Sequence, residues 1–465
     1  MPFFIGILNT EKYINIGILN TDMNLQTLMD MNPWWREKEL IEKDYDIEKW
    51  KEKKHSWIPK ILNEINLKPF ALHILLGPRQ AGKTTAVKLL IREQLKLRDP
   101  KSIFYFNCEA LADYKELIDV IETYLEFKAD SDIKHALIIL DEITLAREWP
   151  RAIKFLIDRG KLKNDVVLLT GSSSIAVKGE GELFPGRRGR GKDFILWPLS
   201  FRQWLKVLEP NLYKKISPIK NFNELKKKAT SAIIWLDKLN KALIKYMTYG
   251  GFPLGIDAIN GNKEEAKQAY LSWIKTAVLK ADRDDLIARQ IFKAILERMP
   301  SALSWEGIAK QIEIKSPKTV SAYVNLFKTM FALVVLYNID ISKKTIKFGK
   351  NKKIHLIDPL LLELLEDWCL VKVKSKESIL AESLVATHLY RIFPDQLFFW
   401  KNGFEIDAVV MENSNLYGFE VKWQERSSKI KPLPQFKDII LLTKKEFSKK
   451  PLKIPLSVFL ALLDV

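Results

Sequence analysis

Short, mostly apolar runs alternate with longer helix-like stretches over the first half of the chain. The runs lie at residues 71–76, 103–107, 136–140 and 166–170, and a helix is predicted at 84–96, directly after the first run and a glycine-rich loop. Apolar strands that alternate with helices indicate a parallel sheet covered on both faces. This half therefore has the pattern of an α/β domain.

The second half begins with a different pattern. A helical region at 222–248 ends in Gly250-Gly251-Phe252-Pro253, a stop signal. Two short helices are predicted at 304–311 and 316–327, spaced as a helix-turn-helix. The segment 343–353 follows with six lysines and no acid. It fits a basic wing that neutralises phosphates, so we predict a winged helix at 284–360. A protein-docking spacer is the alternative use of this fold.

A hairpin is predicted near the C-terminus. Residues 404–410 and 416–422 form two apolar strands joined by a turn. Side chains alternate along a strand, so Glu420 and Lys422 share one face, and Asp407 can oppose them from the neighbouring strand. Two carboxylates can hold Mg²⁺ beside a lysine that helps to activate water, with Glu382 on the preceding helix as a further ligand. The Asp…ExK arrangement resembles the core of PD-(D/E)XK nucleases. The alternatives are an ion-paired hairpin and a degenerate nuclease fold kept for DNA binding.

Composition adds a hypothesis about partners. The chain has 465 residues, 75 Lys+Arg against 57 Asp+Glu, a net charge of +18 and a pI near 9.4. Such an excess favours a polyanionic partner, nucleic acid and in particular DNA, whereas a lysine-rich surface that aids solubility is the alternative.

Other counts exclude several classes of protein. Two cysteines, Cys108 and Cys369, rule out a disulfide framework and a cysteine zinc site. No apolar run reaches membrane-spanning length, and no secretory signal is recognisable at the N-terminus. We therefore expect a cytoplasmic protein without a membrane partner. Residues 5–10 recur as 16–21, a short duplication that leaves Met23, Met29 and Met31 as alternative starts.

The loop after the first apolar run carries the most specific chemistry. It has the form GxxxxGKT and consists of Gly77, Pro78, Arg79, Gln80, Ala81, Gly82, Lys83, Thr84 and Thr85. Its backbone N–H groups and the following helix N-terminus can cradle the phosphates of ATP. Lys83 is expected to contact the β- and γ-phosphates, and the Thr84 hydroxyl to coordinate Mg²⁺.

An acidic pair follows the apolar run at 136–140. Asp141 ends this strand, which suits a carboxylate associated with Mg²⁺. Glu142 comes next and is placed to orient or deprotonate the attacking water, although a helix-start acid is the alternative. Thr170 and Ser172 end the next strand, where either can sense the γ-phosphate or simply cap a helix.

A basic loop at 185–192 contains Arg187 and Arg188 among glycines. We expect the glycines to leave these arginines mobile. A guanidinium can stabilise charge on the transferring phosphoryl group. Contact with nucleic acid and a solvated loop are the alternatives.

Several motifs in order resemble a known family. They are Asn32-Pro33-Trp34-Trp35, the loop at 76–85, Leu140-Asp141-Glu142-Ile143-Thr144, Thr170-Gly171-Ser172-Ser173-Ser174, Pro185-Gly186-Arg187-Arg188-Gly189, Pro198-Leu199-Ser200-Phe201-Arg202 and Gly250-Gly251-Phe252-Pro253. They resemble archaeal and bacterial AAA-type ATPases with a DUF4143-like or PD-(D/E)XK-like C-terminal region, over roughly residues 30–425. The resemblance implies ATP binding, hydrolysis and an AAA-type core.

Together these features predict an α/β protein: a P-loop AAA-type parallel sheet domain with a helical lid, a winged helix and a C-terminal α/β nuclease-like domain. The expected divisions are an N-terminal extension at 1–45, the ATPase domain at 46–210, the lid at 211–283, the winged helix at 284–360 and the nuclease-like domain at 361–465. The predicted function is an Mg²⁺-dependent ATPase that couples nucleotide state to DNA binding or processing. A nucleotide-switched protein-interaction module with slow turnover is the alternative, and a homo-oligomer is compatible with either.

Overall fold

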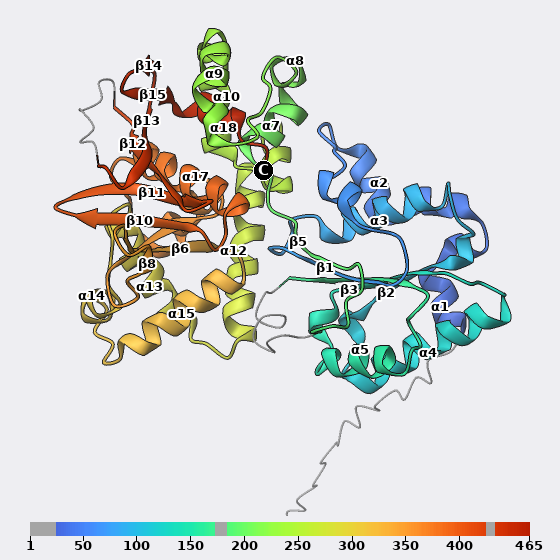
Figure 1. Cartoon of the computed structure of the whole chain (residues 1–465). Helices are drawn as coiled ribbons and strands as arrows, with labels where there is room; N and C mark the ends of the chain where they lie inside the picture. Colours follow the sequence, from blue (N-terminus) through green and yellow to red (C-terminus); the bar gives the residue numbers. More distant parts are fainter. Residues whose placement is uncertain (1–24, 173–183, 425–432) are drawn as a thin grey trace, which may run out of the picture.

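The computed structural model describes residues 25–172, 184–424 and 433–465. The chain forms two lobes, one blue to teal and one green to red in Figure 1. The repeats at 5–10 and 16–21 and the serines Ser173 and Ser174 lie outside the described residues.

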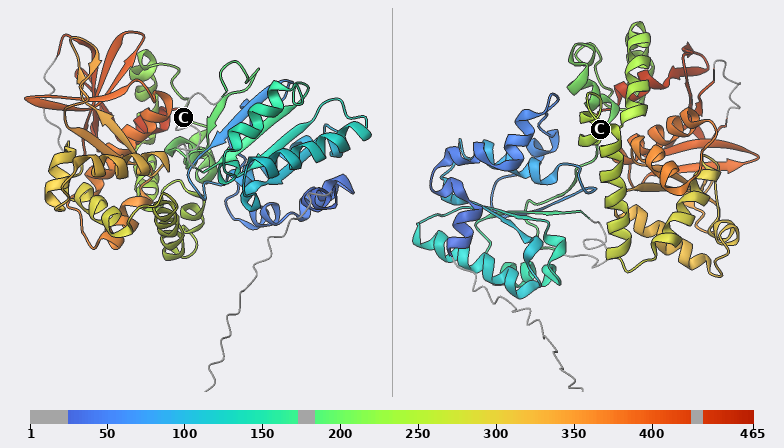
Figure 2. Two further views of the ribbon diagram at one scale, coloured as in Figure 1. Left: turned by 90° about the horizontal axis from the view of Figure 1, so that it is seen from below. Right: turned by 180° about the vertical axis from the view of Figure 1, so that it is seen from behind.

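The first lobe is built on five parallel strands in the order β2-β3-β4-β1-β5. The strands are β1 (Ala71–Leu76), β2 (Ile103–Asn107), β3 (Leu137–Asp141), β4 (Val166–Gly171) and β5 (Asp193–Ile195). Figures 1 and 2 show helices on both faces. They are α1 (Leu25–Met31), α2 (Tyr45–Glu52), α3 (Lys83–Gln94), α4 (Tyr114–Asp130) and α5 (Trp149–Asp158). The predicted parallel α/β sheet is confirmed, with β5 as an additional short strand.

The motif Asn32-Pro33-Trp34-Trp35 covers the edge of this sheet. The Asn32 amide donates to the backbone oxygen of Tyr105 at 2.9 Å and accepts from its N–H at 2.7 Å. The indole nitrogens of Trp34 and Trp35 both donate to Ile103 O. Strand β2 is the sheet's edge, and these contacts occupy backbone groups that an edge otherwise exposes. Trp34 is fully buried in the hydrophobic core of this lobe, so the segment around it packs against the sheet.

The second lobe contains most of the helices and a mixed sheet. Its helices are α7 (Phe201–Leu208), α8 (Pro210–Tyr213), α9 (Leu225–Ala232), α10 (Leu236–Tyr249), α11 (Pro253–Asp257), α12 (Lys263–Lys280), α13 (Asp285–Arg298), α14 (Trp305–Gln311), α15 (Pro317–Thr329), α16 (Leu360–Cys369), α17 (Lys376–Ile392) and α18 (Leu456–Leu462). Its strands are β6 (Leu333–Tyr337), β7 (Ile339–Asp340), β8 (Thr345–Ile346), β9 (Lys352–Leu356), β10 (Leu397–Asn402), β11 (Phe404–Glu412), β12 (Asn415–Lys422), β13 (Phe436–Thr443), β14 (Ser448–Lys449) and β15 (Leu452–Pro455).

The predicted pair of helices before the lysine-rich segment is present as α14 and α15. The Ser304 hydroxyl caps α14 by accepting from Gly307 N–H at 3.0 Å. Strand β6 then pairs antiparallel with β9, and β7 with β8. The six-lysine wing needs correction, because Lys352 and Lys353 belong to β9 and are buried. Four lysines remain in the loop at 341–351.

The C-terminal sheet has six strands in the order β10-β11-β12-β13-β15-β14. The predicted hairpin is confirmed as β11 and β12, which pair antiparallel with Glu412 opposite Asn415. Helices α7, α9 and α10 share a hydrophobic core with α17, α18 and this sheet. The helices that follow the first lobe are therefore not separate from the C-terminal region, since one buried core joins them. Within the described residues, no helix is long and apolar enough to cross a membrane.

Candidate nucleotide-binding site

The glycine-rich loop joins β1 to α3 at the carboxyl end of the sheet. Gly82 has a φ of +91°, a left-handed backbone conformation that residues other than glycine rarely adopt. A Cβ on Gly77 would lie 2.5 Å from Leu196 O, so the backbone here must lack a side chain. Pro78 and Ala81 are buried, whereas Gln80 is exposed. The loop thus presents its backbone at the start of α3, the arrangement that binds phosphate.

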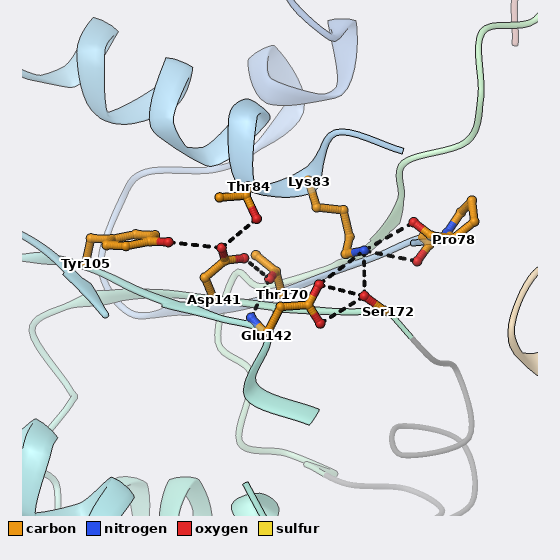
Figure 3. Close-up of polar contacts among 9 residues, drawn as sticks. Pro78, Lys83, Thr84, Tyr105, Asp141, Glu142, Thr170 and Ser172 are labelled. Atoms are coloured by element: carbon orange, nitrogen blue, oxygen red, sulfur yellow. Dashed lines mark hydrogen bonds and ion pairs between the residues drawn. The ribbon is translucent and has the colours of Figure 1, made fainter. Parts of the chain in front are cut away.

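Lys83 points from the first turn of α3 into the centre of the site (Figure 3). Its Nζ donates to Ser172 Oγ at 2.9 Å and to the carbonyls of Gly77 and Pro78 at 3.3 and 3.2 Å. It also lies 3.5 Å from Glu142 Oε1. Burial lowers the pKa of Lys83, and the charges of Glu142 and Asp141 oppose this shift. The ammonium is therefore confined to the position at which a phosphate-binding lysine acts.

Asp141 lies at the end of β3 and is fully buried. Its Oδ2 accepts from Thr84 Oγ1 at 2.8 Å and from the Tyr105 hydroxyl at 3.1 Å, and its Oδ1 accepts from Thr170 Oγ1. A carboxylate and a hydroxyl at adjacent positions are hard oxygen donors of the kind that Mg²⁺ takes together with nucleotide phosphates. The residues present therefore fit a magnesium ion held by Thr84 and Asp141.

Glu142 adopts a left-handed backbone conformation, with φ of +51°. Such a conformation is unfavourable for a non-glycine residue and is retained where the surroundings impose it. Here its N–H donates to Thr170 Oγ1 at 2.9 Å, and its carboxylate accepts from Ser172 Oγ at 2.6 Å. The carboxylate consequently faces Lys83 at the carboxyl edge of the sheet (Figure 3).

The contacts of three residues, Tyr105, Thr170 and Ser172, were not apparent from the sequence. Tyr105 belongs to β2, and only the pairing of β2 with β3 brings its hydroxyl to Asp141. Burial raises the pKa of Tyr105, and the charge of Asp141 adds to the shift, so the phenol remains a donor. Thr170 and Ser172 contact different groups: Thr170 contacts Asp141, and Ser172 bridges Lys83 and Glu142. The sequence indicated only that polar residues end each strand, and it did not indicate which of them meet.

The structure does not bring Arg187 and Arg188 to the phosphate loop. Arg187 Nε donates to Asp158 Oδ1 at 2.6 Å, and Arg188 Nη1 to Asp193 Oδ2 at 2.9 Å. The Arg188 carbonyl accepts from Leu72 N–H, at the opposite end of β1 from the loop. The expectation of mobile arginines beside the γ-phosphate is therefore wrong within this chain, because the segment hydrogen-bonds to β1 and its charges are paired.

A cavity of about 780 Å³ lies between the two lobes and reaches the phosphate loop at Ala81. Trp57, Trp197 and Pro253 contribute apolar walls. Arg391 of α17 also lines it: Nη1 donates to Pro198 O at 2.8 Å, while Nε and Nη2 are buried without a hydrogen-bond partner. The cavity thus combines an apolar lining with unpaired cationic donors.

The nuclease-like residues are only partly brought together. Glu382 and Asp407 converge, but on the ammonium of Lys353, at 3.0 and 2.6 Å. Glu420 pairs with Lys422 at 2.6 Å. In the part of the chain that the structure describes, no three His, Cys, Asp or Glu side chains are arranged to hold a metal ion. Asp407 and Glu420 are therefore each paired with a lysine, Lys353 and Lys422, and their role as a metal pair stays a prediction.

Comparison with known proteins agrees with the fold. Residues 70–205 match a family described as an AAA domain, and residues 377–451 match one described as a domain of unknown function, DUF4143. An uncharacterized protein of Methanocaldococcus jannaschii is 26% identical over 375 residues, 77% of each chain.

Solved structures are more distant. The ORC2 protein of Aeropyrum pernix, in ADPNP and ADP complexes, is 14% identical, with 64% of this chain and 88% of that chain covered and a TM-score of 0.37. The Holliday junction branch migration motor RuvB of Thermotoga maritima is also 14% identical, with 56% and 81% covered and a TM-score of 0.27.

A parallel sheet with a phosphate loop and an acidic pair at its carboxyl edge defines the class of P-loop proteins of the AAA type. Residues 70–205 of this chain match such an AAA domain, and residues 377–451 resemble DUF4143.

Proposed function

We propose that this protein binds ATP with Mg²⁺ and hydrolyses it. The observation that carries the proposal is the convergence of Lys83, Ser172 and Glu142 at the end of the phosphate loop, beside the Thr84–Asp141 pair. This set contains a phosphate-binding cation, a carboxylate for the attacking water and oxygen ligands for the metal. These are the groups that phosphoryl transfer to water requires.

Each side chain has a separate part in the proposed reaction. Backbone N–H groups of the loop and Lys83 bind the β- and γ-phosphates. Thr84 and Asp141 would hold Mg²⁺, which would supply positive charge to the phosphate oxygens. Glu142 orients the attacking water and accepts its proton, and Ser172 positions the carboxylate by its 2.6 Å hydrogen bond. Tyr105 holds Asp141 in place.

The cavity beside Ala81 is the proposed position of the base and ribose. Its volume, about 780 Å³, is in the range of small-molecule sites. Trp57 and Pro253 supply the apolar surface that a planar base requires. Because Arg391 comes from α17, a nucleotide in this cavity would contact both lobes. This contact offers a route by which nucleotide binding reaches the C-terminal region.

Nucleic acid is the proposed partner. The net charge of +18 is concentrated in part on the helical segment 211–249, with nine lysines and two acids. Lys238, Lys241 and Lys245 of α10 are exposed at spacings that place them near one face of the helix. The four lysines of the loop at 341–351 are exposed as well. Such surfaces neutralise phosphates without reading bases.

The experiment that tests the proposal is ATP turnover by the whole chain with and without single- and double-stranded DNA. The proposal predicts Mg²⁺-dependent phosphate release that Glu142→Gln abolishes and that DNA changes. DNA affinity should fall steeply as salt rises, because phosphate contacts release counterions. The exposed Glu148→Gln variant is the matched control and should retain parental turnover.

A nucleotide-switched protein-interaction module is the second candidate. The observation that favours it is the lysine-filled carboxylate cluster, which gives the C-terminal domain no evident catalytic use. This candidate predicts nucleotide binding with slow turnover that DNA does not alter. Turnover unaffected by DNA, together with salt-insensitive or absent DNA binding, would favour it over the first.

A further inference from the structure

A lysine from outside the C-terminal sheet enters that sheet's carboxylate cluster. Lys353 of β9 places Nζ 3.0 Å from Glu382 Oε2, 2.6 Å from Glu405 Oε1 and 2.6 Å from Asp407 Oδ1. Only 1% of its side chain is exposed. Glu382 belongs to α17, and the other two acids belong to β11. One ammonium therefore connects three elements at a single buried point.

The number of donors matches the number of acceptors. A lysine ammonium has three N–H donors, and three carboxylates surround it. Two of the remaining oxygens face other donors: Asp407 Oδ2 accepts from Val421 N–H at 2.8 Å, and Glu405 Oε2 lies 2.9 Å from Lys401 Nζ. Protein donors thus occupy both oxygens of Asp407 and both oxygens of Glu405.

The charge balance explains why a cation must be there. Three carboxylates that converge on one buried point repel one another unless a positive charge lies between them. Burial lowers the pKa of Lys353, but the charges of Asp407, Glu382 and Glu405 outweigh it and raise the pKa above its usual range. The lysine accordingly stays charged. A divalent ion bound by the same oxygens would have to occupy the same space.

We propose that Lys353 takes the position of a divalent cation in the nuclease-like fold, so that the cluster is a metal-free ion pair and cleaves no nucleic acid. Removal of the ammonium frees Glu382, Glu405 and Asp407 to close around a divalent cation. This proposal goes beyond the ATPase function and does not depend on it, since the phosphate loop lies in the other lobe (Figure 1).

The test measures Mn²⁺ binding to the whole chain, without nucleotide, by calorimetry and by the paramagnetic signal of bound ion. The variant is Lys353→Met, which keeps the length of the side chain and removes its charge. Lys352→Met on the same strand is the matched control. The expected result is one additional bound Mn²⁺ in Lys353→Met only, lost again when Asp407→Asn is added.

Two results would overturn the proposal. The first is a folded Lys353→Met protein that binds no more Mn²⁺ than the parent. The second is Mn²⁺ binding, or Mn²⁺-dependent cleavage of plasmid DNA, by the unaltered chain that Asp407→Asn abolishes. The second measurement needs no lysine variant, so it decides the matter even where Lys353→Met does not fold. Absence of Asp407-dependent cleavage and binding in the parent supports the proposal.

Discussion

The ammonium of Lys83 lies 3.5 Å from Oε1 of Glu142, and the Ser172 hydroxyl bridges the two side chains. The group proposed to bind the γ-phosphate and the group proposed to act on water are therefore neighbours in the protein itself. A phosphate bound by Lys83 would compete with Glu142 for the same donors. Nucleotide binding would thereby release the Glu142 carboxylate from its contact with Lys83.

Substitutions at these two positions are expected to separate binding from turnover. Lys83→Ala removes a phosphate contact, so nucleotide affinity and hydrolysis should both fall. Glu142→Gln should retain ATP and lower kcat by about 10²–10⁴-fold, the usual contribution of a general base. Fluorescent-nucleotide titration and phosphate release measure the two effects. Parental turnover in Glu142→Gln would show that this residue is not the base.

Ser172→Ala is expected to affect the chemical step more than binding. The hydroxyl contacts both Lys83 and Glu142, so its loss should leave the carboxylate less well oriented. We expect kcat to fall by about 10-fold or more, by comparison with the cost of removing one positioned donor, with little change in ATP affinity. Thr123→Ala on α4 is the control. An unchanged kcat would exclude a positioning role for Ser172.

Two groups of lysines are expected to contribute to DNA binding. Alanine at Lys343, Lys344, Lys347 and Lys350, or at Lys238, Lys241 and Lys245, should weaken binding to all sequences alike. The slope of log affinity against log salt should become shallower by about 0.9 for each lost phosphate contact. Fluorescence anisotropy over a range of salt measures it. Unchanged slopes in both variants would assign these lysines to solubility or protein docking.

Arg391→Met is expected to weaken the binding of nucleotide but not the binding of phosphate alone. The two unpartnered nitrogens of this arginine are buried at the cavity proposed for base and ribose, and no hydrogen bond of its side chain reaches the phosphate loop among the described residues. ADP affinity should therefore fall while pyrophosphate affinity stays the same. Competition titrations with both ligands provide the measurement. Equal losses for both would instead indicate that Arg391 acts on the loop or on folding.

His388 is expected to make the protein sensitive to acid. Its Nε2 accepts from Phe201 N–H at 2.9 Å, its Nδ1 donates to Leu384 O at 2.8 Å, and burial lowers its pKa to about 3. Between the ordinary value of 6.5 and about 3, the unfolded chain binds a proton that the folded chain excludes. The stability should therefore fall with decreasing pH across this range, by at most about 1.4 kcal/mol per pH unit for this one group.

Urea unfolding at several pH values compares the parent with His388→Gln, and His135→Gln, an exposed histidine, is the control. The His388 variant should be less stable near pH 7 and should lose less stability on acidification. An identical pH dependence in both proteins would mean that His388 takes up its proton equally in the folded and the unfolded chain.

Local features of the sequence determined much of the fold and of the nucleotide site. The phosphate loop, the strands of the first sheet, the cap of α14 at Ser304 and the β11–β12 hairpin depend on neighbouring residues and on side-chain periodicity. Their positions could therefore be predicted. Lys83, Thr84, Asp141 and Glu142 follow the same logic, because the carboxyl ends of parallel strands meet at one edge of the sheet.

The tertiary structure alone decided which distant residues meet. Tyr105 reaches Asp141 only because β2 pairs with β3, and Arg187 is withdrawn from the site because its segment joins the far end of β1. In the sequence, Lys353 looks like one of six wing lysines. In the structure it is buried and contacts Asp407, which lies 54 positions later in the chain. Burial of a charge depends on partners brought by the whole fold, and no local pattern specifies them.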